Sequence, residues 1–552
     1  MLLQKSRTMT AAQAIVECMK MESVEHVFCV PGESYLPILD ALYDESSIHV
    51  ISNRHESGAA FMAEGYAKSM LKPGIVLATR GVGATNLSIG VHTAYQDSTP
   101  MIVLLGQVHS DVRGREGFQE IDFKAYFQPI TKWVVEVKDA KRIPEIMQRA
   151  FRLSQSGRPG PVVISLPEDV LLEEADMYFG PPLSVPKPAP SQADIDEFER
   201  LLGLANYPLI IAGGGVKYAE AEDALVNFAE SYNIPVMAAF RRHDVFPNNH
   251  RLYVGHLGIS PHPAVLQTVK ESDVILAFGT RLSEVTTQNY SMITPNKKMI
   301  HVDIDFKTIG QVYAPHIGVV SDLKEFLQAV MDIHVESTWS EWGRERHDAY
   351  IEASRLQEIE ADFNKQIISI LTKKIPSDAL LTTDAGNFAG WLHSFFSFTN
   401  KHTFVGPTSG AMGYGMPAAL GAKLAHPEKV VVSLSGDGGF MMTMQEIETA
   451  VRYEIPIISL IFNNEMYGTI RMYQEMNYPE KVLATNLGDV SFKDIAKSVG
   501  AIGHIVYTAE EFASALDESL KNKIPSVIEM MTSKEHISVN STITALREQV
   551  KH

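Results

Sequence analysis

The sequence predicts an α/β protein built of three doubly wound parallel-sheet domains. Short apolar runs such as GIVLAT, PMIVLLG and VVVSLSG recur along the chain, each followed by a glycine-containing turn and a helical stretch. Apolar strands that do not alternate with polar residues indicate parallel sheets covered on both faces. Strands that alternate with helices indicate right-handed β-α-β units. The length of 552 residues exceeds what one core usually holds and favours several domains.

Composition divides the chain into three parts. The first, 1–180, contains GIVLAT and PMIVLLG and is followed by the proline-rich segment GPPLSVPKPAP. Because proline cannot donate to a sheet ladder or enter a helix interior, we expect this segment to be an extended linker. The second part, 190–335, contains YPLII, DVILAF and KMIHVD. The third, 350–552, follows a change to charged, helical sequence and contains VVVSL and PIISLIF.

The charge of the chain excludes several classes of partner. Lys and Arg number 48 against 66 Asp and Glu, so the formal net charge is −18. A surface of this sign repels phosphate backbones and anionic lipids, so we expect neither nucleic acid nor a membrane as partner. Two cysteines, Cys18 and Cys29, are too few for a disulfide framework, and no apolar run has the length of a membrane span. We expect a cytoplasmic protein with a small-molecule ligand.

The segment VVVSLSGDGGF combines a buried strand with a turn suited to a phosphate. The strand ends in Gly436, Asp437, Gly438 and Gly439, and we expect a helix to begin near Met441. Glycines let the backbone approach a ligand, and a helix N-terminus offers free N–H groups to a phosphate. Asp437 adds an oxygen ligand for a hard cation.

The next strand, PIISLIF, ends in the pair Asn463-Asn464. Adjacent parallel strands would bring Asp437 and Asn464 side by side at the carboxyl edge of a sheet, with the backbone carbonyl of Met466 nearby. Carboxylate, amide and carbonyl oxygens, completed by phosphate oxygens and water, suit octahedral Mg²⁺. The alternative is that Asp437 only caps a helix and the asparagines form a turn. The second strand with its asparagine pair favours the metal site.

These motifs and five further segments resemble the thiamine-diphosphate enzymes of the acetohydroxyacid synthase (acetolactate synthase) type. In that family a GDG turn is followed by an asparagine pair. The resemblance extends over essentially the whole chain and includes VPGESYLPILDAL, RHESGAAFMAEGYA, GVGATNLSIGVHTAYQDSTPMIVLLGQV, GAMGYGMPAALGA and HVDID. It implies a first domain that binds the aminopyrimidine of thiamine diphosphate, a central domain, and a third domain that binds the diphosphate and Mg²⁺.

The resemblance also implies roles for individual residues. Glu56 in RHE is similar to the carboxylate that bonds N1′ of the aminopyrimidine, although a helix N-terminal charge would look the same. Met412 resembles the apolar residue that bends the cofactor, with a core residue as the alternative, and the Gly410 carbonyl resembles the acceptor of its amino group. Phe118 and Gln119 match the aromatic and amide groups near the reacting carbon. The other implied cofactor contacts are Pro31, Gly32, Gly386, Asn387, Gly436, Asp437, Gly438, Gly439, Asn464 and Met466, of which Asp437, Asn464 and Met466 also bind the metal.

Three positions on the substrate side depart from the family pattern. Glu168 stands where the family usually has a lysine, Val285 where an arginine clamps the second keto acid, and Tyr473 where a tryptophan sets specificity. Without a guanidinium at position 285, a bidentate clamp for a carboxylate is missing. We therefore expect poor discrimination for 2-ketobutyrate over pyruvate as the acceptor.

The central part resembles the FAD domain of the family. The glycine run 213–215, the segment FGTR, and Asp303 and Asp305 could hold a dinucleotide. A glycine cluster is weak evidence for a dinucleotide, and a His-Gly pair of the family reads Ile259-Ser260 here. The sequence therefore leaves FAD open as a cofactor.

The resemblance implies a thiamine-diphosphate- and Mg²⁺-dependent enzyme that decarboxylates a 2-keto acid, most simply pyruvate, and transfers the two-carbon unit to a second carbonyl. Two rivals stay open: another lyase, oxidase or carboligase with the same cofactor and a different acceptor, and a non-catalytic homologue. Retention of Glu56, Asp437 and Asn464 argues against the non-catalytic homologue. The resemblance further implies a homodimer or homotetramer with active sites between subunits.

Overall fold

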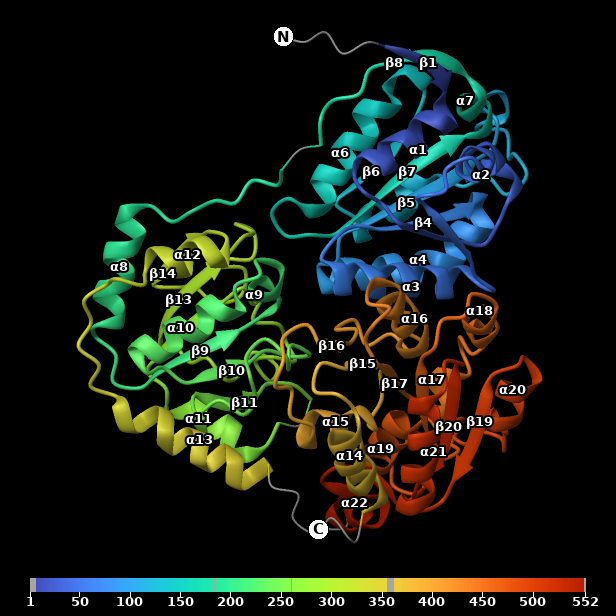
Figure 1. Cartoon of the computed structure of the whole chain (residues 1–552). Coiled ribbons are helices and arrows are strands. Elements are labelled where there is room, and N and C mark those ends of the chain that lie inside the picture. The colour runs from blue at the N-terminus through green and yellow to red at the C-terminus, as the bar shows by residue number, and fades with distance from the viewer. Residues whose placement is uncertain (1–5, 183, 260, 355–361, 551–552) are drawn as a thin grey trace.

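The computed structural model describes residues 6–182, 184–259, 261–354 and 362–550. Across these ranges the chain forms three six-stranded parallel sheets, each with helices on both faces (Figure 1). The prediction of three doubly wound α/β domains is confirmed. The uninterrupted apolar runs explain why: β5 (Met101–Gln107) and β9 (Pro208–Ala212) are buried at every position, as strands between two helical layers must be.

The first domain has the strand order β3-β2-β4-β5-β7-β6, with all neighbours parallel. Helices α3 and α4 cover one face, and α1, α2 and α6 cover the other. An antiparallel pair, β1 with β8, lies outside this sheet. The elements are β1 (Arg7–Thr10), α1 (Ala11–Met21), β2 (His26–Cys29), α2 (Leu36–Tyr43), β3 (His49–Ser52), α3 (Glu56–Met70), β4 (Gly74–Thr79), α4 (Arg80–Asp97), β5, α5 (Phe123–Phe127), β6 (Trp133–Glu136), α6 (Ile143–Gln155), β7 (Pro161–Pro167), α7 (Glu168–Leu172) and β8 (Glu174–Met177).

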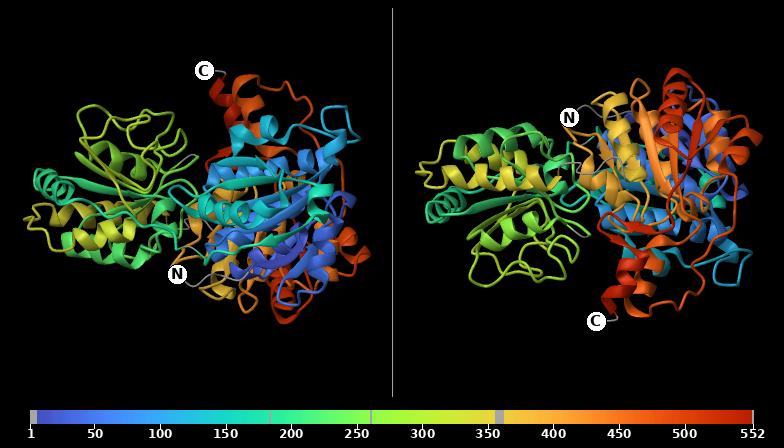
Figure 2. Two further views of the ribbon diagram at one scale, coloured as in Figure 1. Left: turned by 90° about the horizontal axis from the view of Figure 1, so that it is seen from above. Right: turned by 90° about the horizontal axis from the view of Figure 1, so that it is seen from below.

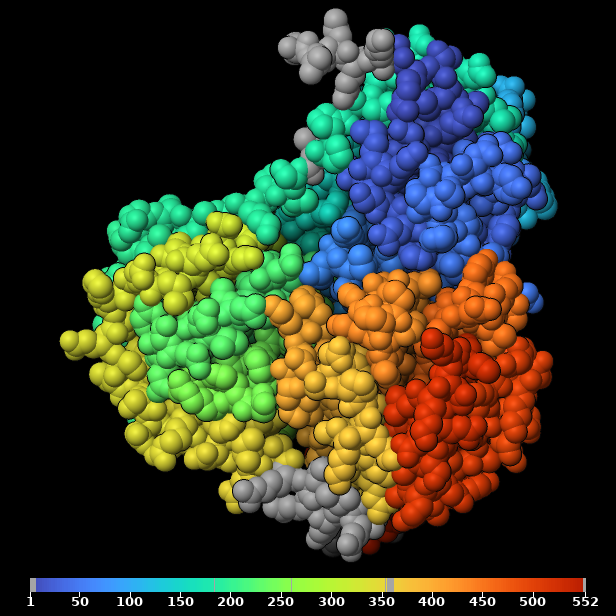
Figure 3. Space-filling model, in the orientation of Figure 1, coloured from blue at the N-terminus to red at the C-terminus, as the bar shows by residue number. Residues whose placement is uncertain are grey.

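The middle domain has the strand order β11-β10-β9-β12-β13-β14, again all parallel. The extended linker reaches it along the surface from the first domain (Figure 3). The elements are α8 (Gln192–Leu202), β9, α9 (Gly214–Tyr218), α10 (Glu222–Tyr232), β10 (Val236–Ala238), β11 (Tyr253–His256), α11 (Pro263–Glu271), β12 (Val274–Phe278), β13 (Lys298–Asp303), β14 (Ile317–Val320), α12 (Leu323–Ala329) and α13 (Ser340–Ser354).

Helix α13 packs on the middle domain, although the sequence suggested that the third domain begins near 350. The indole N–H of Trp342 donates to the carbonyl of Pro208 at 3.0 Å, and the rings of Tyr253 and Tyr350 lie edge to face with centroids 5.3 Å apart. Glu341, Arg344, Glu345 and Asp348 of this helix are exposed, while Trp342, with Trp339 just before the helix, enters the middle core. The packing therefore assigns 340–354 to the middle domain.

The third domain has the strand order β16-β15-β17-β18-β20-β19, all parallel. The elements are α14 (Phe363–Lys374), β15 (Leu380–Thr383), α15 (Ala389–Phe395), β16 (Phe404–Val405), α16 (Gly415–Ala425), β17 (Val431–Gly436), α17 (Asp437–Phe440), α18 (Glu446–Arg452), β18 (Ile458–Asn463), α19 (Gly468–Asn477), α20 (Phe492–Ser498), β19 (Ile502–Val506), α21 (Ala509–Lys521), β20 (Ser526–Met531), β21 (His536–Ser538), β22 (Ser541–Thr542) and α22 (Ile543–Val550).

The first and third domains stack directly on each other, and the middle domain stands to one side (Figure 2). Helix α3 lies on α16 so closely that a Cβ atom at Gly65 would overlap the carbonyl of Ala418, and one at Gly421 would overlap that of Met62. One buried carboxylate joins all three domains. Asp97 accepts the N–H of Thr408 from the third domain at 3.0 Å and pairs with Arg242 of the middle domain at 3.3 Å.

Candidate functional site

The carboxyl edge of the third sheet carries the predicted metal and phosphate motifs. Strands β17 and β18 are paired with Gly436 opposite Phe462, so the residues that follow them emerge side by side. The backbone N–H of Asn464 is near enough to the carboxylate of Asp437 to oppose the rise of its pKa, so the two segments lie together. Parallel sheets bind ligands at this edge.

The helix after the glycine turn begins earlier than expected. It starts at Asp437 rather than near Met441, because Gly436 takes an extended conformation and acts as the N-cap. Asp437 is therefore the first helical residue, and the two glycines after it belong to the first turn. The N–H groups of this turn lie directly at the sheet edge.

The oxygen atoms at this edge suit a hard cation. Burial raises the pKa of Asp437 to about 6, and a divalent cation beside it would favour the ionised form. Within the described ranges, the side-chain amide of Asn464 has no hydrogen-bond partner, whereas that of Asn463 donates to Glu529 at 2.8 Å. Met466 is buried beside them. No cluster of three or more His, Cys, Asp or Glu side chains in the described part of the chain could hold a metal. A site here depends on one carboxylate, an amide and a carbonyl.

The glycines of the turn leave no room for a side chain, because other residues lie close to them. A Cβ atom at Gly438 would lie 2.6 Å from the ring of Tyr467, and one at Gly439 would lie 2.6 Å from Oδ2 of Asp384. Gly386 is exposed at the end of β15, and Asn387 next to it uses its amide within the protein. That amide donates to the carbonyl of Ile537 at 3.0 Å. The turn at 386–387 can therefore offer a ligand its backbone.

Asp384 is a site residue that sequence reasoning missed. Its carboxylate is 1% exposed and accepts the N–H groups of Ala385 at 2.8 Å, Gly413 at 3.0 Å and Tyr414 at 3.4 Å. Together with its contact to Gly439, it joins three of the segments expected to bind the cofactor. Burial raises its pKa to about 6, and the N–H donors oppose that rise. The acidic residue directly after strand β15 was the available signal.

The segment before α16 holds Gly410 and Met412. Gly410 is exposed with φ +72°, a conformation that favours glycine, and a Cβ atom there would meet nothing within 4 Å. Met412 is half-buried and belongs to none of the hydrophobic clusters that the described residues form. An apolar side chain outside the core is what a ligand-supporting role requires.

Glu56 is the first residue of α3, with His55 as the N-cap. Its carboxylate accepts from the side-chain amide of Asn86 on α4 at 3.0 Å and lies 3.3 Å from where a Cβ at Gly83 would be. The segment before it is held by a buried carboxylate of the third domain, since Glu446 accepts the N–H of His55 at 3.0 Å. Among the described residues, no hydrogen bond or ion pair joins Glu56 to the diphosphate motifs of the same chain.

Phe118 and Gln119 lie on the rim of the first domain. Phe118 is 72% exposed, and Gln119 has φ +65° with its carbonyl accepting the N–H of Gly81 at 2.8 Å. The turn at Pro31 and Gly32 packs on Thr79, two residues before Gly81. A Cβ atom at Gly32 would overlap the side chain of Thr79.

The reversed charge at Glu168 has a partner in the structure. Its carboxylate pairs with Nη2 of Arg80 at 3.0 Å. Nη1 of the same guanidinium reaches the carbonyl of Phe118 at 3.4 Å. Sequence reasoning missed Arg80, and the unexplained acidic residue at 168 was the signal that a cation had to be near. Tyr473, on α19, is 49% exposed.

The three domains enclose a cavity of about 680 Å³ beside the glycine run 213–215. Gly214 packs against Arg242, since a Cβ atom at Gly214 would lie 2.8 Å from Nε of that arginine. The outer two glycines instead permit close packing on the backbone of Gly279 and Thr280. Val285 and Asp303 also line this cavity, and burial raises the pKa of Asp303 to about 6. Ser260, part of the departure from the FAD pattern, lies outside the described residues.

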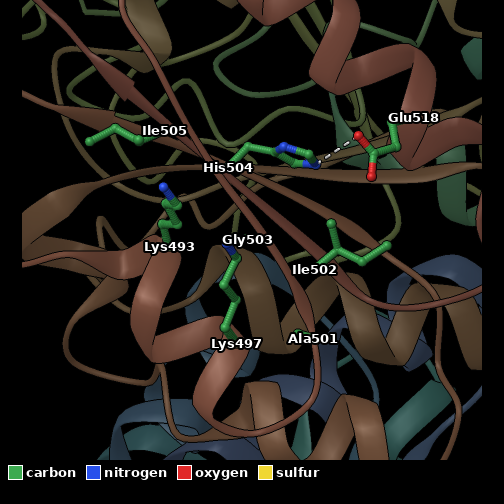
Figure 4. Close-up of a pocket in the computed structure, with 8 residues that line it drawn as sticks. All are labelled: Lys493, Lys497, Ala501, Ile502, Gly503, His504, Ile505 and Glu518. Carbon is green, nitrogen blue, oxygen red and sulfur yellow. Dashed lines mark ion pairs between the residues drawn. The ribbon is translucent and has the colours of Figure 1, made fainter.

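A second hollow, of about 500 Å³, lies at the open edge of the third sheet. It is lined by β19, by two lysines of α20, and by His504, which faces Glu518 of α21 at 3.8 Å (Figure 4). It contains none of the predicted site residues. We therefore place the candidate site at the carboxyl edge of the third sheet and on the rim of the first domain. None of the helices described is both long and apolar enough to cross a membrane.

Comparison with known proteins accounts for all three domains. Profiles of thiamine pyrophosphate enzymes match residues 9–126 as the N-terminal TPP binding domain, 195–330 as the central domain and 384–530 as the C-terminal TPP binding domain. The glycine turn, Asp437 and Asn464 lie inside the C-terminal match, and Glu56 lies inside the N-terminal one. Fold and site therefore define a thiamine-diphosphate-dependent enzyme.

Curated relatives show which group within this class of enzymes the chain resembles. The chain is 34% identical to a probable acetolactate synthase large subunit of Methanocaldococcus jannaschii, over 95% of the chain and 92% of the relative. It is 32% identical to the acetolactate synthase large subunit of Haemophilus influenzae, covering 96% of each, and 33% identical to that of Lactococcus lactis, covering 96% and 93%. The chain belongs to the thiamine pyrophosphate enzyme family, in its acetolactate synthase group, which confirms the resemblance seen in the sequence.

Proposed function

We propose that this protein is a cytoplasmic enzyme that decarboxylates pyruvate and adds the two-carbon unit to the carbonyl of a second 2-keto acid, with thiamine diphosphate and Mg²⁺ as cofactors. The observation that supports this proposal most is the convergence of Asp437, Asn464 and the glycine turn at one sheet edge. We further propose the division 1–180, 190–335 and 350–552 for the three functional parts, except that α13, which includes residues 350–354, belongs with the middle one.

The donor set fits a magnesium diphosphate. Asp437 supplies a hard anionic oxygen, Asn464 an unpartnered amide oxygen and Met466 a backbone carbonyl, and Mg²⁺ takes such ligands together with phosphate oxygens and water. The glycine turn and the exposed turn at 386–387 offer backbone groups to the diphosphate. When bound, thiamine diphosphate supplies the electron sink for carbanion chemistry at a carbonyl carbon.

Glu56 and the segment 410–412 would act on the organic part of the cofactor. The carboxylate of Glu56 would hold a proton on the aminopyrimidine ring nitrogen, and Asn86 keeps that carboxylate oriented. The carbonyl of Gly410 would accept from the amino group of the cofactor, and Met412 would offer it an apolar contact. Phe118 and Gln119 exclude water from the reacting carbon and contact the substrate.

We also propose FAD as the occupant of the cavity between the domains. Three arginines (Arg158, Arg242 and Arg281) line it, which suits an anionic dinucleotide. Gly214 also lines it, next to Arg242. Absorbance of the purified protein near the flavin bands, before and after incubation with FAD, tests this assignment.

The active site is proposed to lie between two subunits of a homodimer. Support comes from Glu56, which makes no contact with the diphosphate motifs among the described residues of its own chain. Inactive Glu56→Gln and Asp437→Ala subunits should recover activity when mixed under conditions of subunit exchange, because one site of each mixed dimer carries neither defect. No recovery after demonstrated exchange would show that each chain builds its own site.

The test of the reaction is CO₂ release from pyruvate with and without thiamine diphosphate and Mg²⁺, with products followed by NMR. We expect acetolactate only when both cofactors are present. A protein that binds thiamine diphosphate but yields another product from pyruvate would favour the rival carboligase or oxidase, which Val285 and Glu168 leave open. Binding without turnover of any 2-keto acid would favour a non-catalytic homologue.

A further inference from the structure

Arg80 lies on the rim of the first domain with part of its guanidinium unused. Its side chain is 12% exposed, and Nη2 pairs with Glu168 at 3.0 Å. The contacts of Nη1 are long, 3.4 Å to the carbonyl of Phe118 and 3.6 Å to the carboxylate of Glu33. Nε is buried without a hydrogen-bond partner among the described residues. A guanidinium has five N–H donors, and most of the N–H donors of Arg80 are not used in short hydrogen bonds among the described residues.

The backbone around Arg80 is strained in a way that fixes this position. Arg80 has φ +42° and Gln119 has φ +65°, both in the left-handed region that costs a non-glycine residue free energy. The two strained segments are locked together, because Gly81 donates to the carbonyl of Gln119 and a Cβ at 81 would lie 2.8 Å from that oxygen. Strain of this kind persists where a site needs a side chain in one place.

Arg80 is the first residue of the helix that carries the contacts of Glu56. Gly83 and Asn86, which approach the Glu56 carboxylate, follow Arg80 by three and six residues on α4. Gly83 therefore lies about one helical turn from Arg80. The guanidinium reaches the carbonyl of Phe118 at 3.4 Å, directly before Gln119 in the chain.

We propose that Arg80 binds the carboxylate of the acceptor 2-keto acid and that Glu168 positions the guanidinium. This inference rests on the proposed function. The donor loses its carboxylate as CO₂, so an arginine bound to that group would stabilise the ground state and slow the reaction. The acceptor keeps its carboxylate in the product, so a charge-assisted bond to it does not oppose the chemistry. Glu33, whose side chain is 65% exposed, can turn to solvent as the acceptor enters.

The experiment compares a charged and a neutral acceptor in one reaction. The enzyme receives pyruvate together with ¹³C-labelled acetaldehyde. In each turnover the bond from the carboxyl carbon to the carbonyl carbon of the donor breaks, and CO₂ leaves. A new carbon–carbon bond forms to a second pyruvate, giving acetolactate, or to acetaldehyde, giving labelled acetoin, and solvent supplies a proton to either product. The label separates this acetoin from any formed by decay of acetolactate.

Arg80→Gln should shift the acetolactate-to-labelled-acetoin ratio about 10- to 100-fold toward acetoin, the range expected for loss of a charged hydrogen bond. The ratio is independent of how much enzyme is folded. Arg80→Lys should restore part of the wild-type ratio, because lysine keeps the positive charge but lacks the paired N–H donors of the guanidinium. Arg113→Gln is the matched control. Arg113 also pairs with two carboxylates, Glu120 at 2.6 Å and Glu136 at 2.8 Å, in the same loop region, and its loss should leave the ratio unchanged.

An unchanged ratio in Arg80→Gln, or an equal shift in Arg113→Gln, overturns the assignment. Absence of any product from the wild-type enzyme would instead contradict the proposed function. If both Arg80 variants are inactive, wild-type enzyme decides the question with pyruvamide as the competing neutral acceptor, since the amide cannot act as a donor. Preference for pyruvate of about tenfold or more supports the proposal, and equal use of the two acceptors overturns it.

Discussion

Replacing Asp384 by asparagine should weaken thiamine diphosphate binding without removing any group that touches the cofactor. The carboxylate uses Oδ1 for the N–H groups of Ala385 and Tyr414 and Oδ2 for that of Gly413. Asparagine keeps one acceptor oxygen, so its NH₂ group must face at least one of these N–H donors. One bond to an ionised acceptor is then lost, and a buried donor is left unpaired.

The expected size follows from that loss. A hydrogen bond to a charged group contributes about 1.5–3 kcal/mol, which corresponds to about 10- to 150-fold in an equilibrium constant. This free energy should be lost from cofactor binding, because Asp384 joins the loops at 385–387 and 410–414, and both loops must be ordered to bind the cofactor. Calorimetry of the cofactor-free protein with thiamine diphosphate and excess Mg²⁺, well above pH 6, measures the change.

Asp244→Asn is the control for general destabilisation. Asp244 is equally buried and accepts the N–H of Thr403 at 2.9 Å and of Phe404 at 3.1 Å, but it pairs with Lys217 at the boundary with the middle domain. Both variants should lower the unfolding temperature, and only Asp384→Asn should raise the dissociation constant. Equal dissociation constants in the two variants would refute the reasoning. If Asp384→Asn does not fold, hydrogen exchange on the wild-type protein should show the N–H of Gly413 protected before the cofactor is added.

Three further predictions concern the cofactor and pH. Glu56→Gln should slow C2–H/D exchange of bound thiamine diphosphate by about 10²–10⁴-fold, measured by NMR, with cofactor affinity preserved. Asp437→Ala should abolish calorimetric binding of the cofactor, and excess Mg²⁺ should restore little of it. Between the middle and third domains the ring of His243 stacks on that of His393 and lies edge to face with that of His256. Burial lowers the pKa of each histidine, that of His256 from 6.5 to about 4. As the pH falls, these histidines bind protons in the unfolded chain before they do so in the folded protein. The free energy of unfolding should therefore fall below pH 6.5, by about 3 kcal/mol for His256 alone at pH 4. Urea unfolding from pH 8 to 4 measures the decline, and His256→Phe should flatten it.

The sequence was informative where chemistry follows a strand directly. Asp437 and Asn464 could be paired from sequence alone because parallel strands end at one edge, and the intervening helix length does not matter. The same reasoning did not pair Arg80 with Glu168. Each directly follows a strand, β4 or β7, but β5 lies between these strands, and that order is known only from the structure. A glycine run was also a poor guide to a ligand. Two of the glycines at 213–215 serve the approach of one backbone to another.

The sequence shows that Asp384 directly follows β15, but it does not show what this residue does. Its importance lies in its burial and in the three N–H groups aimed at it, and Gly413 and Tyr414 lie far from it along the chain. The start of α17 was misplaced because a glycine N-cap leaves no side-chain signal. Local patterns therefore predicted the elements and the first ligands, while contacts between loops required the structure.

The crossing of α3 and α16 determines which parts of this enzyme move. At Gly65 and Gly421 the two helices touch backbone to backbone, with no side chains between them to slide or change rotamer. A tilt or shear at this crossing would drive carbonyl oxygens into Cα atoms, so the first and third domains of one chain behave as a single rigid block. We therefore expect any motion during turnover in the rim segments, such as the exposed loop at Phe118 and the stretch after α19, where Tyr478 and Leu483 are exposed to solvent.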